Sequence, residues 1–249
     1  MTQPSKPKFS VITAYYKEDL SIVLRAIESV KAMVSDTYEV NHYLVSDGHP
    51  LAELDALDVI HLKLHKSHGD YGDTPRLMGA MLAIREGSKG LMFLDADNMV
   101  YPNHLLEAEK KFQNDETNIV LTKRLYLRPD GSVIPFKCQE DDDFSHVDTG
   151  CFVFFDEAVY EALEWSKIPR ELSCYGDRYF WNLLRSKRNH YGATDTPTIG
   201  YTCLWRGVYE TVKETPPDEA KSIDPAEVEA FFHSLDHEAL QKLNHRLKR

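Results

Sequence analysis

The stretch that decides the fold is residues 89–98, KGLMFLDADN. Its first part is a continuous apolar run, which is typical of a strand buried on both faces of a parallel sheet. The run stops abruptly at two carboxylic acids, Asp95 and Asp97. Ligands of open α/β sheets bind beyond the carboxyl ends of the strands, so this pattern predicts a binding site at that edge.

The chain before this stretch alternates between strand and helix patterns. Strands are predicted at residues 8–14, 39–46 and 59–64, and helices at residues 18–34, 74–87 and 102–111. The second helix has Thr74 as its predicted N-cap and Pro75 at its first helical position. This alternation predicts an α/β fold, an open sheet with helices on both faces.

The pattern changes after residue 112. A hairpin with a Pro-Asp-Gly turn, an acidic loop, a strand, a helix and a last strand are predicted in that order at residues 118–136, 139–148, 150–155, 176–186 and 197–204. Residues 215–217, TPP, resemble a linker, and Asp224 to Glu227 match a capping box. We therefore expect a catalytic domain over 1–214, with halves 8–112 and 113–214, and a C-terminal helical extension over 215–249.

The two acids after the buried strand also predict a metal site. Neighbouring carboxylates repel each other and lose hydration, so a compensating charge is needed. Mg²⁺ or Mn²⁺ supplies it, and such ions often bridge carboxylates to substrate phosphates. Alternation along the strand sends Asp95 and Asp97 to the same side, where they can share one metal. The alternative is a solvated turn whose acids cap the following helix.

In this order the motifs resemble the glycosyltransferase A fold, a Rossmann-like mixed sheet, and in particular its family-two group, over residues 8–205. The carrying motifs are VITAYYKED (11–19), LVSDGHP (44–50), GDYGDTPRLMGAMLAIREG (69–87) and FLDADN (93–98). The resemblance implies that Asp95 and Asp97 form the Asp-x-Asp whose metal binds the donor diphosphate. It places Asp47, Arg76 and the loop from Thr13 to Tyr15 at the nucleoside. The family's second strand usually carries two acids, and its helix has Arg-Asn; here there is one acid, and Leu77 follows the arginine.

Sugar transfer with inversion requires a general base to take the acceptor proton. The resemblance places this acid at a helix start, which implies Asp177 in YGDRYFW, with Asp148 in HVDTGCF as second choice. Asp177 is equally explained as a helix N-cap, and Asp148 as a residue that shapes the loop over the donor sugar. If configuration is retained, no such base is needed and Asp177 would position a substrate. Arg206 is a candidate for the diphosphate, because arginine binds phosphate oxygens in pairs, or else an ordinary surface residue.

Composition narrows the class of partner. A formal net charge of -11 argues against nucleic acid, whose binding requires basic patches. No apolar signal region and no stretch of roughly 20 apolar residues is visible, so we expect no transmembrane segment. The four cysteines form no CxxC pair, which favours reduced thiols and a cytoplasmic location.

The sequence therefore predicts a metal-dependent glycosyltransferase, with Mn²⁺ or Mg²⁺ as cofactor. Its donor would be a UDP- or GDP-sugar and its acceptor a carbohydrate or glycolipid. Two alternatives remain open: a haloacid-dehalogenase-type phosphatase, whose nucleophile also lies in a strand-ending Asp-x-Asp, and a non-catalytic binder of nucleotide sugars. The apolar face of the C-terminal helix is explained equally by a homodimer and by docking on its own domain.

Overall fold

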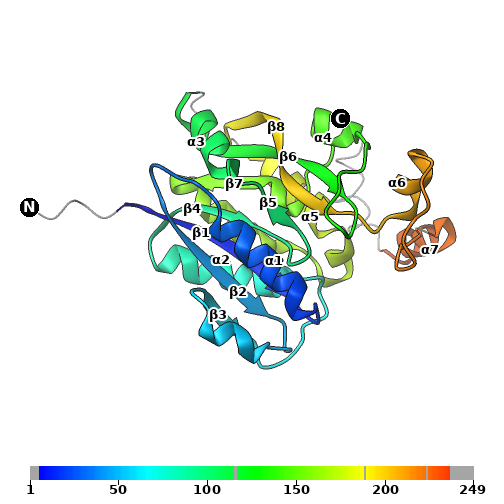
Figure 1. Ribbon diagram of the computed structural model, residues 1–249, viewed down its shortest axis with the longest axis horizontal. Coiled ribbons are helices and arrows are strands. Elements are labelled where there is room, and N and C mark those ends of the chain that lie inside the picture. The colour runs from blue at the N-terminus through cyan, green and yellow to red at the C-terminus, as the bar shows by residue number, and fades with distance from the viewer. Residues whose placement is uncertain (1–5, 115–116, 188, 223, 236–249) are drawn as a thin grey trace, which may run out of the picture. The chain divides into compact units, whose positions relative to one another are not determined.

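A mixed sheet of eight strands organises the chain (Figure 1). The computed structural model describes residues 6–114, 117–187, 189–222 and 224–235. Strands span Lys8–Tyr15 (β1), Glu39–Ser46 (β2), Ile60–Lys63 (β3), Ser88–Phe93 (β4), Met99–Val100 (β5), Ile119–Leu127 (β6), Phe152–Phe155 (β7) and Tyr191–Thr202 (β8), in the order β3-β2-β1-β4-β7-β6-β8-β5. Helices span Leu20–Lys31 (α1), Asp73–Arg85 (α2), His104–Asn114 (α3), Gln139–Asp143 (α4), Gly176–Arg185 (α5), Arg206–Thr211 (α6) and Pro225–Ser234 (α7), with a long 3₁₀ segment over Asp156–Lys167 (η3).

The first half of the sheet is parallel. β1 pairs with β2 on one side and with β4 on the other, and β2 pairs with β3. The connections through α1 and α2 run in opposite directions along the sheet, so right-handed crossovers place these helices on opposite faces. This confirms the predicted α/β alternation, and it brings the carboxyl ends of β1, β2 and β4 to one edge.

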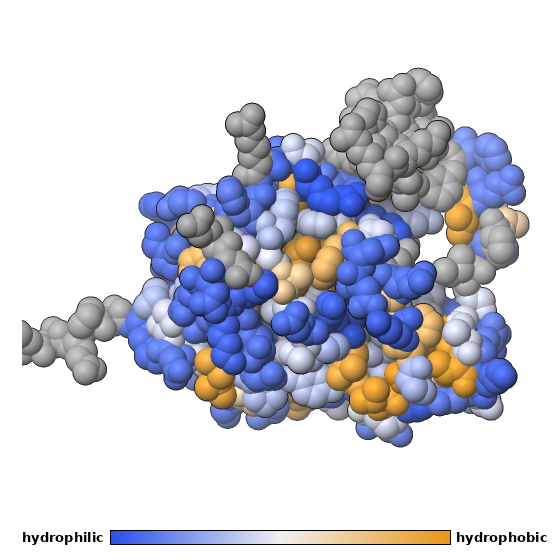
Figure 2. All heavy atoms as spheres, turned by 90° about the horizontal axis from the view of Figure 1, so that it is seen from above, coloured by the Kyte–Doolittle hydropathy of each residue, from blue (hydrophilic) through white to orange (hydrophobic). Residues whose placement is uncertain are grey.

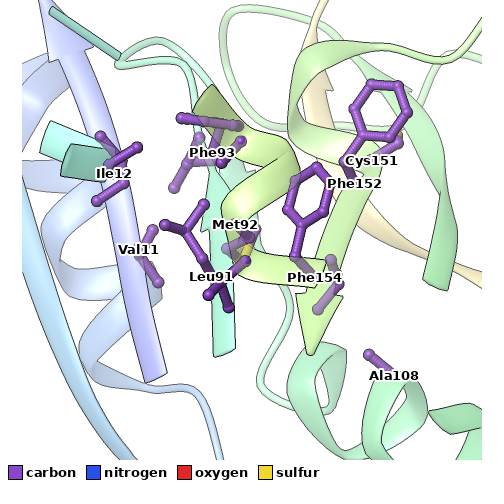
Figure 3. Packing of buried hydrophobic residues seen from close by; sticks show 14 of the residues in the cluster. Val11, Ile12, Leu91, Met92, Phe93, Ala108, Cys151, Phe152 and Phe154 are labelled. Atoms are coloured by element: carbon purple, nitrogen blue, oxygen red, sulfur yellow. The ribbon is translucent and has the colours of Figure 1, made fainter. Parts of the chain in front are cut away.

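The second half turns the sheet into a mixed one. β7 lies antiparallel to both β4 and β6, and β5 lies antiparallel to β8. Figure 3 shows Val11 and Ile12 of β1, Leu91 to Phe93 of β4 and Phe154 of β7 packed across neighbouring strands. All of these side chains are fully buried. Burying each is worth about 1.5–3 kcal/mol, so the packing across these three strands contributes strongly to the stability of the sheet.

The structure corrects two local predictions at the site edge. β4 ends at Phe93, and a turn follows in which the amide of Asn98 donates to the carbonyl of Asp95 at 3.0 Å. The alternation that we expected to align Asp95 with Asp97 is therefore wrong, because Asp and Asn favour turns over strands. Helix α2 begins at Asp73, with Gly72 at its N-cap. The amide of Thr74 donates to the carboxylate of Asp70 at 3.0 Å. The side chain that caps the start of this helix is therefore that of Asp70 and not, as predicted, that of Thr74.

Smaller differences lie in the second half. The predicted acidic loop contains helix α4, and the second strand of the predicted hairpin is reduced to a bridge between Leu127 and Val133. The segment η3 was not predicted, although its buried residues Ala158, Ala162 and Trp165 recur at helical spacing. Helix α5 and strand β8 appear close to their predicted positions.

Two compact units divide the chain: residues 1–125 with 138–201, and residues 126–137 with 202–249. In the second unit, Arg128 forms an ion pair with Glu214 at 2.6 Å. Its helix α7 agrees with the predicted C-terminal helix, and the carboxylate of Asp224 accepts the amide of Ala226 at 2.8 Å. Residues 236–249 of the predicted extension lie outside the described residues, and the predicted domain boundary at residue 214 stays a prediction.

The surface is mostly polar on the face that Figure 2 shows, with apolar side chains in small separate groups. Across the ranges that the structure covers, no helix combines the length and the apolar character needed to cross a membrane.

The close approach of α2 to the sheet can be tested at Gly79. A Cβ atom there would lie 2.5 Å from Cγ2 of Ile12 and 3.0 Å from Cγ2 of Val45. We expect Gly79→Ala to lower the free energy of unfolding by about 1–3 kcal/mol in a urea titration, because overpacking outweighs the gain in helix propensity. Gly207→Ala in α6, where a Cβ meets nothing within 4 Å, is the control and should be neutral or slightly stabilising. Equal stability of the two variants would contradict this packing.

Candidate functional site

A pocket of about 500 Å³ lies at the carboxyl ends of β1, β2 and β4. Five of the residues predicted for the site line it: Tyr15, Asp47, Arg76, Asp95 and Asp97. They come from three strand ends and from helix α2, and the parallel order of the strands brings them together. The sheet edge thus gathers residues as far apart in the chain as Tyr15 and Asp97.

Asp47 organises the loop that forms one wall of the pocket. Its carboxylate accepts the amide of His68 at 3.0 Å and the hydroxyl of Ser67 at 3.2 Å, and it lies 2.7 Å from Nδ1 of His68. Gly48 has a φ of +81°, and a Cβ there would lie 2.3 Å from the amide nitrogen of Ser67. Asp47 therefore binds the loop through its carboxylate, and Gly48 lets the backbone of residues 66 and 67 come close, because only glycine permits this approach.

Arg76 is the central cation of the pocket. Its Nη2 donates to Oδ1 of Asp95 at 2.5 Å, and its Nη1 donates to the carbonyl of Tyr71 at 2.9 Å. The guanidinium also lies 5.1 Å from the ring centre of Trp165. Burial tends to lower the pKa of Arg76, but the carboxylate of Asp95 outweighs it and raises that pKa. The arginine is thus charged and fixed in place.

Asp97 has the opposite electrostatic environment. Burial, followed by the charges of Asp95 and Glu18, raises the pKa of Asp97 to about 7. Several acids, Asp95, Glu18 and Asp148, therefore act together on Asp97 and disfavour a negative charge there.

A hard divalent cation fits this chemistry. It prefers carboxylate oxygens, and Mg²⁺ commonly binds one or two of them together with substrate phosphates. Within the described ranges, no group of three or more His, Cys, Asp or Glu side chains is arranged to hold a metal. Metal binding by Asp95 and Asp97 therefore stays a prediction, and other ligands, such as a diphosphate, would have to complete the site.

Asp177 and Asp148 lie close enough to this acidic region to interact electrostatically with it. Oδ2 of Asp177 lies 2.6 Å from Nε2 of His146. Burial tends to raise the pKa of Asp177, but the hydrogen bond and charge of His146 outweigh it, so that pKa is lowered. Asp148 accepts Nη1 of Arg124 at 2.8 Å and the amide of Gly150 at 3.1 Å. Its carboxylate is thus engaged by a buried arginine, whereas Asp177 pairs with a histidine.

The structure does not bring every predicted residue to the pocket. Thr13 is fully buried, and its hydroxyl lies 2.8 Å from Nε2 of His42, so it does not line the pocket. Tyr15 does line the pocket, but its hydroxyl lies 2.6 Å from Nε2 of His61. Arg206 begins α6 in the second unit, and its expected contact with a diphosphate stays a prediction.

Several lining residues were not predicted as ligands. Glu18, Asp70 and the exposed ring of Tyr71 all face the pocket. Arg124, fully enclosed by Asp141 and Asp148, was also missed. The sequence did contain a signal for Arg124, because it lies within the apolar strand pattern IVLTKRLYL. An arginine buried in a sheet requires acidic partners.

Comparison with known proteins supports the fold. No protein-family model matches the chain, and no curated protein sequence matches it. S. aureus TarS, residues 1–349, in complex with UDP is similar in structure, with a TM-score of 0.63 and 15% identity over 97% of this chain and 71% of that one. The same protein with UDP-GlcNAc gives a TM-score of 0.65 and 16% identity over 96% and 71%. The fold of the present chain is thus the glycosyltransferase A fold that the sequence predicted.

The buried acid Asp73 allows a test of the electrostatics. It lies at the start of α2, 3.8 Å from Nη1 of Arg76, and its side chain is 9% exposed. Burial raises its pKa from 3.8 to about 7. The folded state is therefore penalised as pH rises from about 4 towards 7, and the full penalty is present above 7.

We expect Asp73→Asn to remove that penalty. The variant should be more stable than wild type by about 2–4 kcal/mol at pH 8, and the difference should vanish near pH 4. Chemical unfolding at a series of pH values measures it, with Asp58→Asn at an exposed position as control. If the difference in stability between Asp73→Asn and wild type did not change with pH, the raised pKa of Asp73 would be contradicted.

Proposed function

We propose that this chain transfers a sugar from a nucleotide-diphospho-sugar, with UDP as the nucleotide, to the hydroxyl of a carbohydrate or glycolipid acceptor. The observation that carries the proposal is the convergence of Asp47, Arg76, Asp95 and Asp97 on one pocket at the sheet edge. Structures of the same fold have been determined with UDP and with UDP-GlcNAc. The pocket volume of about 500 Å³ lies within the range of pockets that bind ligands of this size.

The pocket walls suit a nucleoside. Tyr16 and Tyr71 are 40% and 74% exposed, and both line the pocket, so their rings are available to stack on a base. Asp47 holds the loop at residues 66–68 that forms the facing wall. A uracil and its ribose would lie between these groups.

The diphosphate would lie towards the acids. Asp95 and Asp97 would hold Mn²⁺ or Mg²⁺, which, when bound, neutralises the charge that develops on the leaving diphosphate. Arg76 keeps Asp95 in one orientation through its hydrogen bond and so preorganises this end of the pocket.

The acceptor side would use Asp177. Its lowered pKa keeps the carboxylate ionised and able to take a proton near neutral pH. In an inverting reaction the acceptor oxygen attacks the anomeric carbon while its proton passes to Asp177. The bond from that carbon to the diphosphate oxygen breaks, and its electron pair stays on the diphosphate. The expected cytoplasmic location and the homodimer remain predictions.

The fold does not support the phosphatase alternative. The Asp-x-Asp follows the fourth strand in chain order, and Asp95 is already paired with Arg76 rather than available as a nucleophile. A non-catalytic binder of nucleotide sugars would share the pocket, and only turnover distinguishes it from a transferase.

Binding can be tested by thermal unfolding with UDP and UDP-GlcNAc, with and without Mn²⁺. At 100 times the dissociation constant, a ligand adds about 2.7 kcal/mol of stability, which raises the melting temperature measurably. We expect the shift to require Mn²⁺, to be abolished by EDTA and to be lost in Asp97→Asn. Asp58→Asn, at an exposed acid, should keep it. A metal-independent shift would remove Asp97 from the proposed ligand set.

Turnover is tested by UDP release from UDP-GlcNAc with water as acceptor. We expect Asp177→Asn to lower kcat by about 10²–10⁴-fold while UDP binding is unchanged, because this residue does not line the donor pocket. If wild type binds UDP but releases none from the sugar nucleotide, the chain is a binder and not a transferase for this donor.

A further inference from the structure

His146 faces the proposed base from a different part of the chain. It lies in the segment between α4 and β7, and Asp177 lies in the first turn of α5. Nε2 of the imidazole is 2.6 Å from Oδ2 of the carboxylate, and the two side chains are 10% and 26% exposed. The other carboxylate oxygen, Oδ1, accepts the amide of Arg178 at 2.7 Å. One side-chain contact and one backbone contact thus determine how the carboxylate points.

The segment that carries His146 is itself held rigidly. Arg124 of β6 forms ion pairs with Asp141 at 3.0 Å and with Asp148 at 2.8 Å, on either side of His146 in sequence. The arginine and Asp148 are buried, with side chains 5% and 9% exposed. In addition, Nε1 of Trp181 on α5 donates to the carbonyl of Phe144 at 2.7 Å. The imidazole is therefore placed by a fixed framework and not by a free loop.

The position of His146 matters because other charged groups surround Asp177. Asp148, from the same segment as His146, and Asp73 of α2 both repel a negative charge on Asp177. On its own helix, Arg178 attracts it, and His146 supplies the hydrogen bond and the facing charge. Without His146, burial and the charges of Asp148 and Asp73 would act on Asp177 against the charge of Arg178.

We infer that His146 is a positioning residue for the transfer reaction: its Nε2–H holds the Asp177 carboxylate towards the acceptor. The inference rests on the proposed function, in which Asp177 receives the acceptor proton. His146 itself exchanges no proton with the substrate in this arrangement, since it acts through the carboxylate it binds.

Two substitutions separate orientation from charge. His146→Gln places an amide N–H near the position of Nε2, so it keeps a hydrogen bond but carries no charge. His146→Ala removes both. His190→Gln is the control, since the hydrogen bonds described for that exposed histidine come from its backbone.

The first measurement is the pH profile of UDP release from UDP-GlcNAc. We expect His146→Ala to lower kcat by about 10²-fold near pH 7 with KM for the donor unchanged, and to move the acid limb of the profile to higher pH. His146→Gln should recover much of kcat, with its acid limb between those of wild type and His146→Ala. A uniform loss at every pH, or a loss confined to KM, would show that His146 has only a structural role and would overturn the inference. Near-UV circular dichroism of both variants checks that they fold.

A second measurement does not depend on turnover. The protein is labelled with ¹³Cγ-aspartate, and the resonance of Asp177 is identified by its absence in Asp177→Asn. Its titration midpoint should be higher in His146→Ala than in wild type, and equal midpoints would overturn the pairing. If wild type neither binds UDP nor releases it, the proposed function fails while this titration still decides the role of His146 towards Asp177.

Discussion

The buried ion pair between Arg76 and Asp95 is the interaction on which the rest of the site depends. The guanidinium lies 2.5 Å from the Asp95 carboxylate, and Trp165 lies against its face. Besides Asp95, the charge of Arg76 interacts with further acids, namely Asp73 and Asp148. A guanidinium suits this place because its donors are fixed in one plane and it remains charged when buried.

The packing of helix α2 on the sheet fixes the position of Arg76. Helix α2 packs so closely on β1 and β2 that Gly79 leaves no room for a methyl group, and Arg76 lies one turn earlier on the same helix. Its height above the sheet is therefore set by backbone packing, not by the arginine side chain. Because protein interiors are close-packed, a change at the helix–sheet contact would reach the ion pair directly.

The acids of the site fall into two groups. Asp47, Asp148 and Asp177 each have a specific partner, which is respectively the loop at His68, Arg124 and His146. Asp73 and Asp97 have raised pKa values, because burial and neighbouring acids outweigh what their surroundings offer. Ionising a carboxyl group whose pKa is raised by burial costs stability, and such groups cluster at functional sites. A bound cation would offset the negative charge of Asp97. At Asp73, protonation of the carboxyl group removes the charge instead.

The sequence by itself determined the parallel half of the sheet, the buried strand β4 and the acids that follow it. It did so because apolar runs, turn residues and helical periodicity are local signals. It also indicated Asp47, Arg76 and Asp177, each placed by a motif beside a strand end or a helix start. Other features depend on residues distant in the chain and were decided only by the tertiary structure. These include the end of β4 before Asp95, the burial of Thr13, and the pairing of His146 with Asp177 across thirty-one positions. Periodicity carries no information about which side chains meet, because that is set by how helices and strands pack against one another.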